Sequence, residues 1–277
     1  MGHFFKGGYI MYKWEAEGDA RAVIVIVHGA MEHQGRYKWL VEMWRSEGYH
    51  VIMGDLPGHG LTTRARRGHI NSFEEYIIAV KDWIQEAYKY QLPVFVLGHS
   101  MGGLIAIRLL QTDEVNIAGL ILSSPCLGLM TYPNKAIQAA SAVLNVTFPK
   151  FRSETGLTID MVTRNPEVRE ASSNDPLYIT KVSVRWYREL LEAVKEAFKD
   201  IPELDDVPFM LMQAGDDRVV DNIQVKEWFN YTLNSEKFYK EWPGLYHELF
   251  SEPEREEVFQ YAKYFVENRL RSLGYVV

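Results

Sequence analysis

Val94-Phe-Val-Leu-Gly-His-Ser-Met-Gly-Gly103 is the stretch that decides the fold. It is an apolar run that ends in a G-x-S-x-G motif. Such a motif alone is weak evidence, because it arises by chance in many chains. Here a β-branched run precedes it and an aliphatic segment follows it, which predicts a strand, a sharp turn at Ser100 and a helix. That context is the one a nucleophilic serine requires.

The residues around Ser100 fit this turn. Gly98 and Gly102 flank the serine at positions where a Cβ would collide with the crossing strand and helix. The N-terminus of the predicted helix adds free N–H groups and the positive end of its dipole. We therefore expect Ser100 to be a nucleophile with oxyanion donors beside it.

A second apolar run, Ala22–Val27, lies upstream and predicts a buried strand of a parallel sheet. It leads into His28-Gly29. In serine hydrolases a loop at this place supplies the second oxyanion donor, so we expect the N–H of Ala30 to face the N–H of Met101. An ordinary strand-to-helix loop is the alternative interpretation.

Strands and helices alternate through the first half of the chain. From Tyr12 the pattern indicates strand material, whereas the first ten residues lack a pattern and are assigned no role. The further predicted elements are helix 37–47 closed by Gly48, strand 50–53, helix 73–89 and strand 117–124. This alternation implies an α/β fold with a mostly parallel central sheet and helices on both faces.

The alternation stops between Cys126 and about Asp200. Helical patterns cover 134–146 and 184–199, with an irregular, proline-containing stretch between them. We divide the chain into a first core part (1–125), a helical cap (126–200) and a second core part (201–277). The cap is strongly apolar. Ordinary packing explains most of this, but a substrate channel that includes Leu127 and Leu129 would explain why a short cap is so apolar.

The remaining catalytic candidates follow the last strands. Asp217 comes just after a strand over 207–213, with Asp216 as the close alternative, and Asp221 is expected to cap a helix over 223–233. His247 follows the last strand, 237–242. We expect His59, in an earlier loop, to organise that loop instead, because the general base of this architecture comes late in the chain.

Ser100, Asp217 and His247 occur in the order that marks the α/β-hydrolase triad. His247 would take the proton of Ser100 and later donate it to the leaving alcohol. Asp217 would hold the imidazole tautomer and stabilise the imidazolium.

At these residues the chain resembles a known family. The motifs are His28-Gly-Ala-Met-Glu-His-Gln-Gly-Arg-Tyr37, Gly98-His-Ser-Met-Gly-Gly103, Asp217-Arg218, Gly244-Leu-Tyr-His247 and, in the cap, Ser173-Asn-Asp-Pro-Leu177. From about residue 12 to residue 270 the chain resembles the monoacylglycerol lipase and lysophospholipase branch of the α/β-hydrolases, and its bacterial phospholipase members in particular.

The resemblance implies hydrolysis of one fatty-acyl ester on a small polar head, such as glycerol or glycerophosphate. It also implies that Ala30 and Met101 supply the oxyanion N–H groups and that Glu32 and Arg36 shape the region near the polar head. A carboxylesterase or acyl-thioesterase acting on small acyl substrates is the alternative enzyme. A non-catalytic scaffold that binds an apolar ligand is the alternative of another class.

The composition argues against several classes of partner and cofactor. The 277 residues carry a formal net charge of −7, which argues against a nucleic-acid surface, and the short basic run Arg64–Arg67 is interpreted as a solvated loop. Cys126 is the only cysteine, so it cannot form an internal disulfide, as in proteins of a reducing compartment. The histidines are not spaced as metal ligands, and we expect neither a metal nor a cofactor.

Localisation follows from similar arguments. No run approaches the roughly 18 apolar residues of a membrane span, and no signal peptide pattern begins the chain, so we expect a cytoplasmic protein. The apolar cap is expected to touch a membrane surface peripherally, where lipid substrates reside. The sequence does not indicate an oligomeric state.

Overall fold

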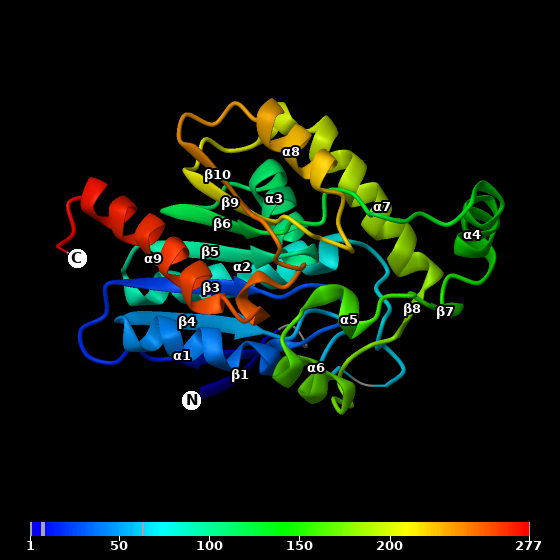
Figure 1. Cartoon of the computed structure of the whole chain (residues 1–277), viewed down its shortest axis with the longest axis horizontal. Helices are drawn as coiled ribbons and strands as arrows, with labels where there is room; N and C mark the ends of the chain where they lie inside the picture. Colours follow the sequence, from blue (N-terminus) through cyan, green and yellow to red (C-terminus); the bar gives the residue numbers. More distant parts are fainter. Residues whose placement is uncertain (1, 7–8, 63, 277) are drawn as a thin grey trace.

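The computed structural model describes residues 2–6, 9–62 and 64–276 and is built around one large sheet (Figure 1). Its eight strands lie in the order β1-β2-β4-β3-β5-β6-β9-β10. The bounds are β1 (Gly2–Lys6), β2 (Tyr9–Trp14), β3 (Ala22–Val27), β4 (Tyr49–Gly54), β5 (Val94–His99), β6 (Gly119–Ser123), β9 (Phe209–Ala214) and β10 (Lys237–Trp242). In this sheet the neighbours in the run β4-β3-β5-β6-β9-β10 pair in parallel, whereas β2 pairs antiparallel with both β1 and β4. The predicted α/β-hydrolase fold is therefore confirmed.

Helices cover both faces of this sheet, which explains why its central strands are apolar throughout. In β3, Val23 and Val25 belong to one apolar core, and Ile24 and Ile26 belong to the other. Because successive side chains of a strand point to opposite faces, a strand covered on both sides needs apolar residues at every position. All six residues of β3 are accordingly buried.

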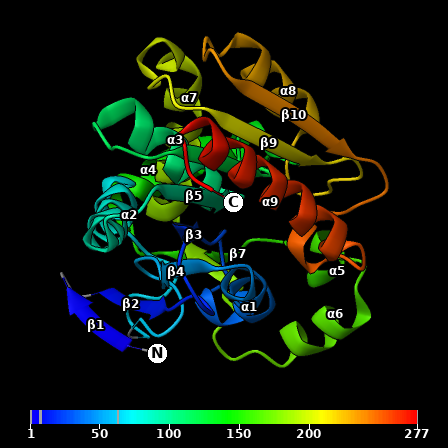
Figure 2. The same ribbon diagram turned by 90° about the vertical axis from the view of Figure 1, so that its left-hand side faces the viewer.

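Different helices cover the two faces of the sheet (Figure 2). One face carries α1 (Lys38–Ser46) and α9 (Arg255–Ser272), and the other carries α2 (Glu74–Ala87), α3 (Met101–Thr112), α7 (Val184–Lys199) and α8 (Asn222–Tyr231). Trp44 of α1 joins the first layer together, since its ring lies 4.8 Å from that of Phe259 and 5.2 Å from that of Tyr49. Gly48 ends α1 with a φ of 80°, as predicted.

Four short 3₁₀ segments accompany the helices and strands among the described residues. They are Gln34–Tyr37, Tyr88–Tyr90, Ile201–Glu203 and Leu249–Ser251. None of the helices in the described ranges combines the length and the apolar character needed to cross a membrane.

The segment between β6 and α7 holds more structure than the sequence pattern indicated. Besides α4 (Lys135–Thr147) it contains α5 (Ile159–Val162), α6 (Pro166–Ser173) and an antiparallel pair, β7 (Arg152–Glu154) and β8 (Lys181–Ser183). Proline did not exclude a helix here, because Pro166 occupies the first turn of α6 and Asn165 caps it. The domain division at 126 and 200 stays a prediction, since the buried side of α7 joins the main core.

The first ten residues, to which the sequence pattern assigns no role, contribute to the sheet in their described part. Residues Gly2–Lys6 form β1 and pair with β2, with Phe4 opposite Met11. Antiparallel pairing at a sheet edge relies on backbone hydrogen bonds, so it does not require the apolar pattern that marks a central strand.

Candidate active site

The turn between β5 and α3 is the nucleophile elbow that the sequence predicted. Ser100 has a φ of 52° and a ψ of −118°, a backbone conformation that L residues rarely adopt. The flanking glycines make it possible. A Cβ on Gly98 would lie 2.6 Å from the carbonyl oxygen of Gly102, and a Cβ on Gly102 would collide with the carbonyl oxygen of Val27. The strained turn is therefore held by close backbone packing on both sides.

Three side chains from distant parts of the chain meet at this elbow. The Nε2 atom of His247 lies 2.9 Å from the Oγ of Ser100, and its Nδ1 atom lies 2.8 Å from Oδ2 of Asp217. All three side chains are buried. Asp216, the alternative considered from the sequence, is exposed and does not take this place. The geometry matches a serine, base and acid relay.

Asp217 is anchored on its other side as well. Its Oδ1 accepts hydrogen bonds from the N–H groups of Val219 and Val220, both at 2.9 Å. Burial alone would raise the pKa of this carboxyl, but His247 and these two N–H groups hold the pKa below its usual value. Asp217 is therefore ionised at neutral pH.

The pKa of the His247 imidazole shifts in the opposite direction. Burial alone would lower the pKa of His247, but the charge and hydrogen bond of Asp217 raise this pKa above its ordinary value. A base with a raised pKa takes the proton of Ser100 more readily and can then give it to the leaving group.

The loop after β3 lies directly against the elbow. A Cβ on Gly29 would lie 2.8 Å from Oε1 of Glu32 and 3.1 Å from the Cβ of Ser100, so glycine permits this close approach without a shift of its neighbours. The N–H of Gly29 donates to Oε1 of Glu32 at 2.6 Å, and the Tyr37 hydroxyl donates to the same oxygen at 2.7 Å. These bonds fix the peptide that precedes Ala30.

Met101 is the first residue of α3, and the first N–H groups of a helix have no acceptor within the helix. Its N–H is thus available beside Ser100, on the side of the positive helix end. The donor roles of Ala30 and Met101 stay predictions that this arrangement favours.

Two other histidines, His59 and His28, form hydrogen bonds that hold the loops near the site. His59 is fully buried and its Nδ1 lies 3.0 Å from the carbonyl oxygen of Pro57. Burial lowers its pKa to about 3, so it is neutral at physiological pH. His28 accepts the N–H of Leu56 on Nε2 at 2.9 Å, which joins the loops after β3 and β4. His59 therefore organises its loop, as expected.

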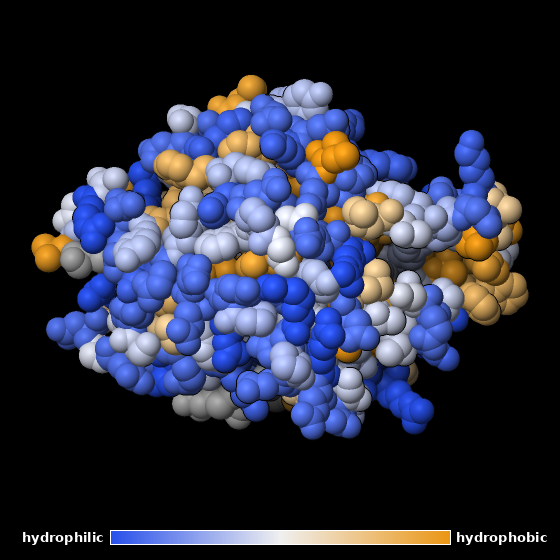
Figure 3. Space-filling view, viewed as in Figure 1, coloured by the Kyte–Doolittle hydropathy of each residue, from blue (hydrophilic) through white to orange (hydrophobic). Residues whose placement is uncertain are grey.

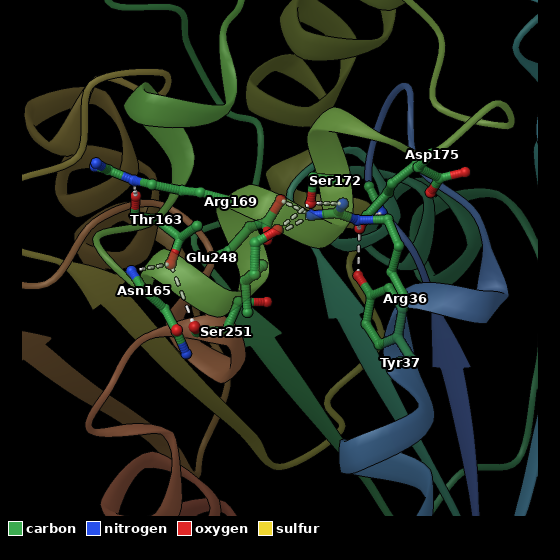
Figure 4. A network of polar contacts seen from close by, with 12 residues as sticks. Arg36, Tyr37, Thr163, Asn165, Arg169, Ser172, Asp175, Glu248 and Ser251 are labelled. Carbon is green, nitrogen blue, oxygen red and sulfur yellow. Dashed lines mark hydrogen bonds and ion pairs between the residues drawn. The ribbon is translucent and has the colours of Figure 1, made fainter.

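An ionic cluster that no local sequence pattern indicates joins Arg36 to Glu248, the residue after His247; Figure 4 shows Arg36 and Glu248 pointing toward one another. Arg36 donates from Nη2 to both carboxylate oxygens of Glu248, at 3.0 and 2.9 Å. Its Nε donates to Glu32 at 3.3 Å, and its Nη1 donates to the hydroxyl of Ser172 in α6. Arg36 thereby joins the loop of Glu32, the loop of His247 and the cap.

Further bonds tie the same cap segment to the same two loops. His33 Nε2 lies 2.7 Å from Oδ2 of Asp175, and the N–H of Ile179 donates to the carbonyl oxygen of Met31. The N–H of Glu248 donates to the carbonyl oxygen of Val162 at 2.8 Å. The segment from α5 to Ile179 is therefore built into the walls of the site.

Two residues of the quoted motifs, Arg218 and Tyr246, lie beside the triad, although the sequence alone assigns them no role. The guanidinium of Arg218 lies 4.0 Å from the ring centre of Tyr246, and the two side chains also share a hydrogen bond. Since Arg218 follows Asp217 and Tyr246 precedes His247, this pair links the two loops of the triad. Their signal in the sequence is their place in these motifs, next to the catalytic candidates.

The candidate substrate residues are placed in different ways. Glu32 and Arg36 line a cavity of about 50 Å³ together with His99 and Glu248. Leu127 has no exposed surface and lies in the main core, whereas Leu129 is partly buried and bridges to Val220. We therefore retain Leu129 as the candidate for contact with an acyl chain.

Within the described ranges, no group of three or more His, Cys, Asp or Glu side chains is arranged to hold a metal ion. Cys126 is buried near the site, and burial raises its pKa to about 12, so its thiol stays protonated.

Known proteins resemble this chain along most of its length. A profile of the family described as "Serine aminopeptidase, S33" matches residues 18–254. The chain is 57% identical to "Phospholipase YtpA" of Bacillus subtilis (strain 168), covering 93% of this chain and 99% of that protein. It is 31% identical to "Monoglyceride lipase" of Homo sapiens, covering 97% of this chain and 90% of that protein.

Solved structures give the same result. The monoacylglycerol lipase of Paleococcus ferrophilus superposes with a TM-score of 0.83 at 28% identity, covering 94% of this chain and 99% of that one. The resemblance identified from the motifs is thus confirmed. The chain belongs to the S33 family of serine hydrolases with the α/β-hydrolase fold.

Proposed function

We propose that this protein hydrolyses the acyl ester of monoacylglycerols or lysophospholipids through an acyl-enzyme on Ser100. The observation that carries the proposal is the continuous hydrogen-bonded chain from Asp217 through His247 to Ser100, at the N-terminus of α3. The names of the relatives, a phospholipase and several monoglyceride lipases, support a lipid ester as substrate.

The first half-reaction forms the acyl-enzyme. The Ser100 oxygen attacks the ester carbonyl carbon while His247 Nε2 takes the hydroxyl proton. The carbonyl oxygen becomes an oxyanion, which the N–H groups of Ala30 and Met101 stabilise. His247 then gives its proton to the leaving alcohol, and the C–O bond to that alcohol breaks.

The second half-reaction releases the fatty acid. Water attacks the acyl carbon as His247 takes one water proton, and the oxyanion forms again in the same place. When the intermediate collapses, the bond to Ser100 breaks and the serine recovers its proton from His247. Every proton moves between side chains, water and substrate, so the scheme uses no metal or cofactor.

Turnover of a p-nitrophenyl acyl ester by Ser100→Ala tests the nucleophile. We expect activity to fall by at least about 10³-fold, because the residue that forms the covalent bond is missing. Retained turnover would contradict the proposal. A competitive panel of monoacylglycerols, diacylglycerols and lysophosphatidylcholines of graded acyl length then ranks the head group and chain length.

The same panel separates the alternative enzymes. A carboxylesterase or acyl-thioesterase for small substrates would give its highest kcat/KM with short acyl chains or thioesters. A scaffold that only binds an apolar ligand would hydrolyse none of them. The intact triad geometry favours catalysis over that last alternative.

We assign the polar head of the substrate to the side of the cavity lined by Glu32 and Arg36. At about 50 Å³ the cavity has room for one or two water molecules, so a glycerol head would need it to widen. The acyl chain would then lie on the side of Leu129. Alanine at Leu129 should lower kcat/KM for long acyl chains more than for acetate esters.

We also propose that the cap touches a lipid surface peripherally. Figure 3 shows apolar residues gathered at the end of the molecule that carries α4. The exposed apolar side chains of this "α4 face" are Ile137, Val143, Val146, Phe148 and Phe151. Monomeric proteins rarely leave such a contiguous patch bare, and lipid esters reside in membranes.

Sedimentation with phosphatidylcholine vesicles tests this contact. Val146 and Phe148 are 81% and 69% exposed, so Val146→Ser/Phe148→Ser should weaken binding without disturbing the fold. A matched control, Ile223→Ser/Leu233→Ser, alters side chains that are 70% and 80% exposed on α8 and just beyond it. Equal losses in both variants, or none in the first, would remove the assignment to the α4 face.

A further inference from the structure

A basic loop lies beside the α4 face, although it is far from α4 in the sequence. This "basic band" consists of Arg64, Arg66, Arg67, Lys150 and Arg152. The side chains of Arg64, Arg66 and Lys150 are exposed, and those of Arg67 and Arg152 are half-buried. Lys150 stands between Phe148 and Phe151, so the apolar and basic residues form one continuous surface.

Hydrogen bonds hold the two segments of the band together. Arg152 donates from Nε to the carbonyl oxygen of Arg67 at 3.1 Å and from Nη2 to that of Ala65 at 2.8 Å. Strand β8 lies against the same loop, since the N–H of Ser183 donates to the carbonyl oxygen of Gly68 at 2.7 Å. The loop and the segment after α4 thus form one surface whose parts have fixed positions.

The charge of this surface is not neutralised locally. The carbonyl acceptors of Arg152 carry no net charge. Among the five residues of the basic band, as far as the described residues show, only Arg66 has a carboxylate within 4.0 Å, that of Glu75. Positive charge at this surface therefore faces solvent.

The sequence segregates charge in the same way. No Asp or Glu occurs between Asp55 and Glu74 or between Glu114 and Glu154. These two segments hold six of the 30 Lys and Arg residues and none of the 37 Asp and Glu residues, in a chain with a net charge of −7. The acidic remainder would be repelled by a negatively charged surface, whereas this one face would be attracted to it.

We infer that the basic band binds an anionic lipid bilayer and turns the α4 face toward it. The inference rests on the proposed membrane contact and adds a chemical preference: headgroups with net negative charge over zwitterionic ones. Apolar side chains would enter the acyl boundary while the flanking Lys and Arg pair with headgroup phosphates, the arrangement typical of interfacial helices on anionic membranes.

The size of the preference follows from the number of charges. Each Lys or Arg close to an anionic bilayer strengthens binding by about fivefold at low salt, so three of them give on the order of 100-fold. Added salt should erase most of this gain, because the charges lie at the surface and are screened.

The test is sedimentation of the full chain with two kinds of vesicle, pure phosphatidylcholine and an equimolar mixture with phosphatidylglycerol. The variant Arg64→Gln/Arg66→Gln/Lys150→Gln removes three exposed charges of the band. The control Lys195→Gln/Lys199→Gln/Arg271→Gln changes the net charge equally on side chains that are 67%, 81% and 52% exposed elsewhere. Turnover of a water-soluble acetate ester without vesicles reports catalysis separately.

We expect the wild type and the control to prefer the anionic vesicles by at least about tenfold, and the band variant to lose this preference. All three should hydrolyse the soluble ester equally, since none of these residues belongs to the triad or its loops. Equal binding to both vesicles by the wild type, or an undiminished preference in the band variant, would overturn the inference. So would binding to a DNA duplex as tight as to the anionic vesicles.

The outcomes also separate the inference from its premises. Binding of the wild type to neither vesicle would overturn both the membrane contact and the preference. If the wild type did not hydrolyse the soluble ester, the proposed hydrolysis would be contradicted. The comparison of the two vesicle types would still test the lipid preference.

Discussion

Arg36 offers the sharpest perturbation of the site. Its side chain is 10% exposed and lies between two carboxylates, those of Glu32 and Glu248, which are 6% and 9% exposed. The variant Arg36→Met keeps the volume of the side chain but removes its charge and all its hydrogen bonds. The buried carboxylates of Glu32 and Glu248 then lose the cation that they share.

The expected cost follows from that arrangement. Breaking a buried ion pair by removing one partner typically costs about 3–5 kcal/mol, because the remaining charge is left uncompensated. We expect the free energy of unfolding of Arg36→Met to fall by about that amount at neutral pH. The control Arg45→Met breaks a pair with Glu42, which is 58% exposed, and should cost less than about 1 kcal/mol.

The cost should depend on pH. Burial alone would raise the pKa of Glu32, but His99 and Arg36, together with the hydrogen bonds of Tyr37 and Gly29, hold this pKa below its ordinary value. In the wild type Glu32 thus adds stability above its unfolded pKa of about 4.3, and this is lost as the pH falls. Removing Arg36 takes away one of the groups that lower this pKa, so the pKa of Glu32 should be higher in the variant than in the wild type. The variant should therefore lose the most stability at the pH values where Glu32 is ionised.

Urea unfolding of wild type and variant, at neutral pH and near pH 5, measures both effects. The deficit should be largest at neutral pH and shrink toward about pH 4. The double variant Arg36→Met/Glu248→Gln should recover part of the loss. A deficit below about 1 kcal/mol at neutral pH, or one that is the same at both pH values, would refute this reasoning.

Four further predictions follow from the fold and the triad. Asp217→Asn should lower kcat by about 10³–10⁴-fold, and should move the rising limb of the kcat/KM profile to lower pH, because the carboxylate raises the pKa of His247; an unmoved limb would count against this pairing. Gly102→Ala should destabilise the protein by about 3 kcal/mol or more and abolish ester turnover, since its Cβ would collide with backbone oxygens, and a folded, active variant would contradict the steric account of the elbow. Asp221→Ala should cost about 1 kcal/mol in urea unfolding, because Asp221 caps α8 through the N–H of Ile223, and an unchanged midpoint would exclude that cap. Trp44→Ala should cost about 3–5 kcal/mol by the same measurement, as its fully buried ring joins α1 to α9, and a loss of less than half of this would mean that the layer repacks.

The central elements could be predicted from the sequence because their patterns are local. Continuous apolar runs such as Ala22–Val27 occur only where both faces of a strand are covered. Strand 237–242 was predicted with the bounds that the structure has. The elbow was equally accessible, since a strand, Ser100 between two glycines and a helix form one short motif.

The connections that no local pattern encodes escaped prediction. Arg36 and Glu248 are 212 positions apart, and neither has neighbours that reveal the other. Helix α6 was hidden by Pro166, which usually signals an irregular segment but here opens a helix. Strand β1 was missed because edge pairing leaves little trace in the order of apolar residues.

The choice between Asp217 and Asp216 shows where sequence reasoning stops. Both follow the same strand, and a one-residue shift decides which carboxylate turns inward. Only the coordinates show that Asp217 bonds to His247 while Asp216 is exposed.

The most direct test of the account is covalent labelling with a fluorophosphonate probe, followed by mass spectrometry of the labelled peptide. The probe reacts with a serine only when a neighbouring base and oxyanion donors activate it. The account predicts a single adduct on Ser100, slowed strongly in His247→Ala and absent in Ser100→Ala. An adduct on another residue, or equal labelling of Ser100→Ala, would contradict it.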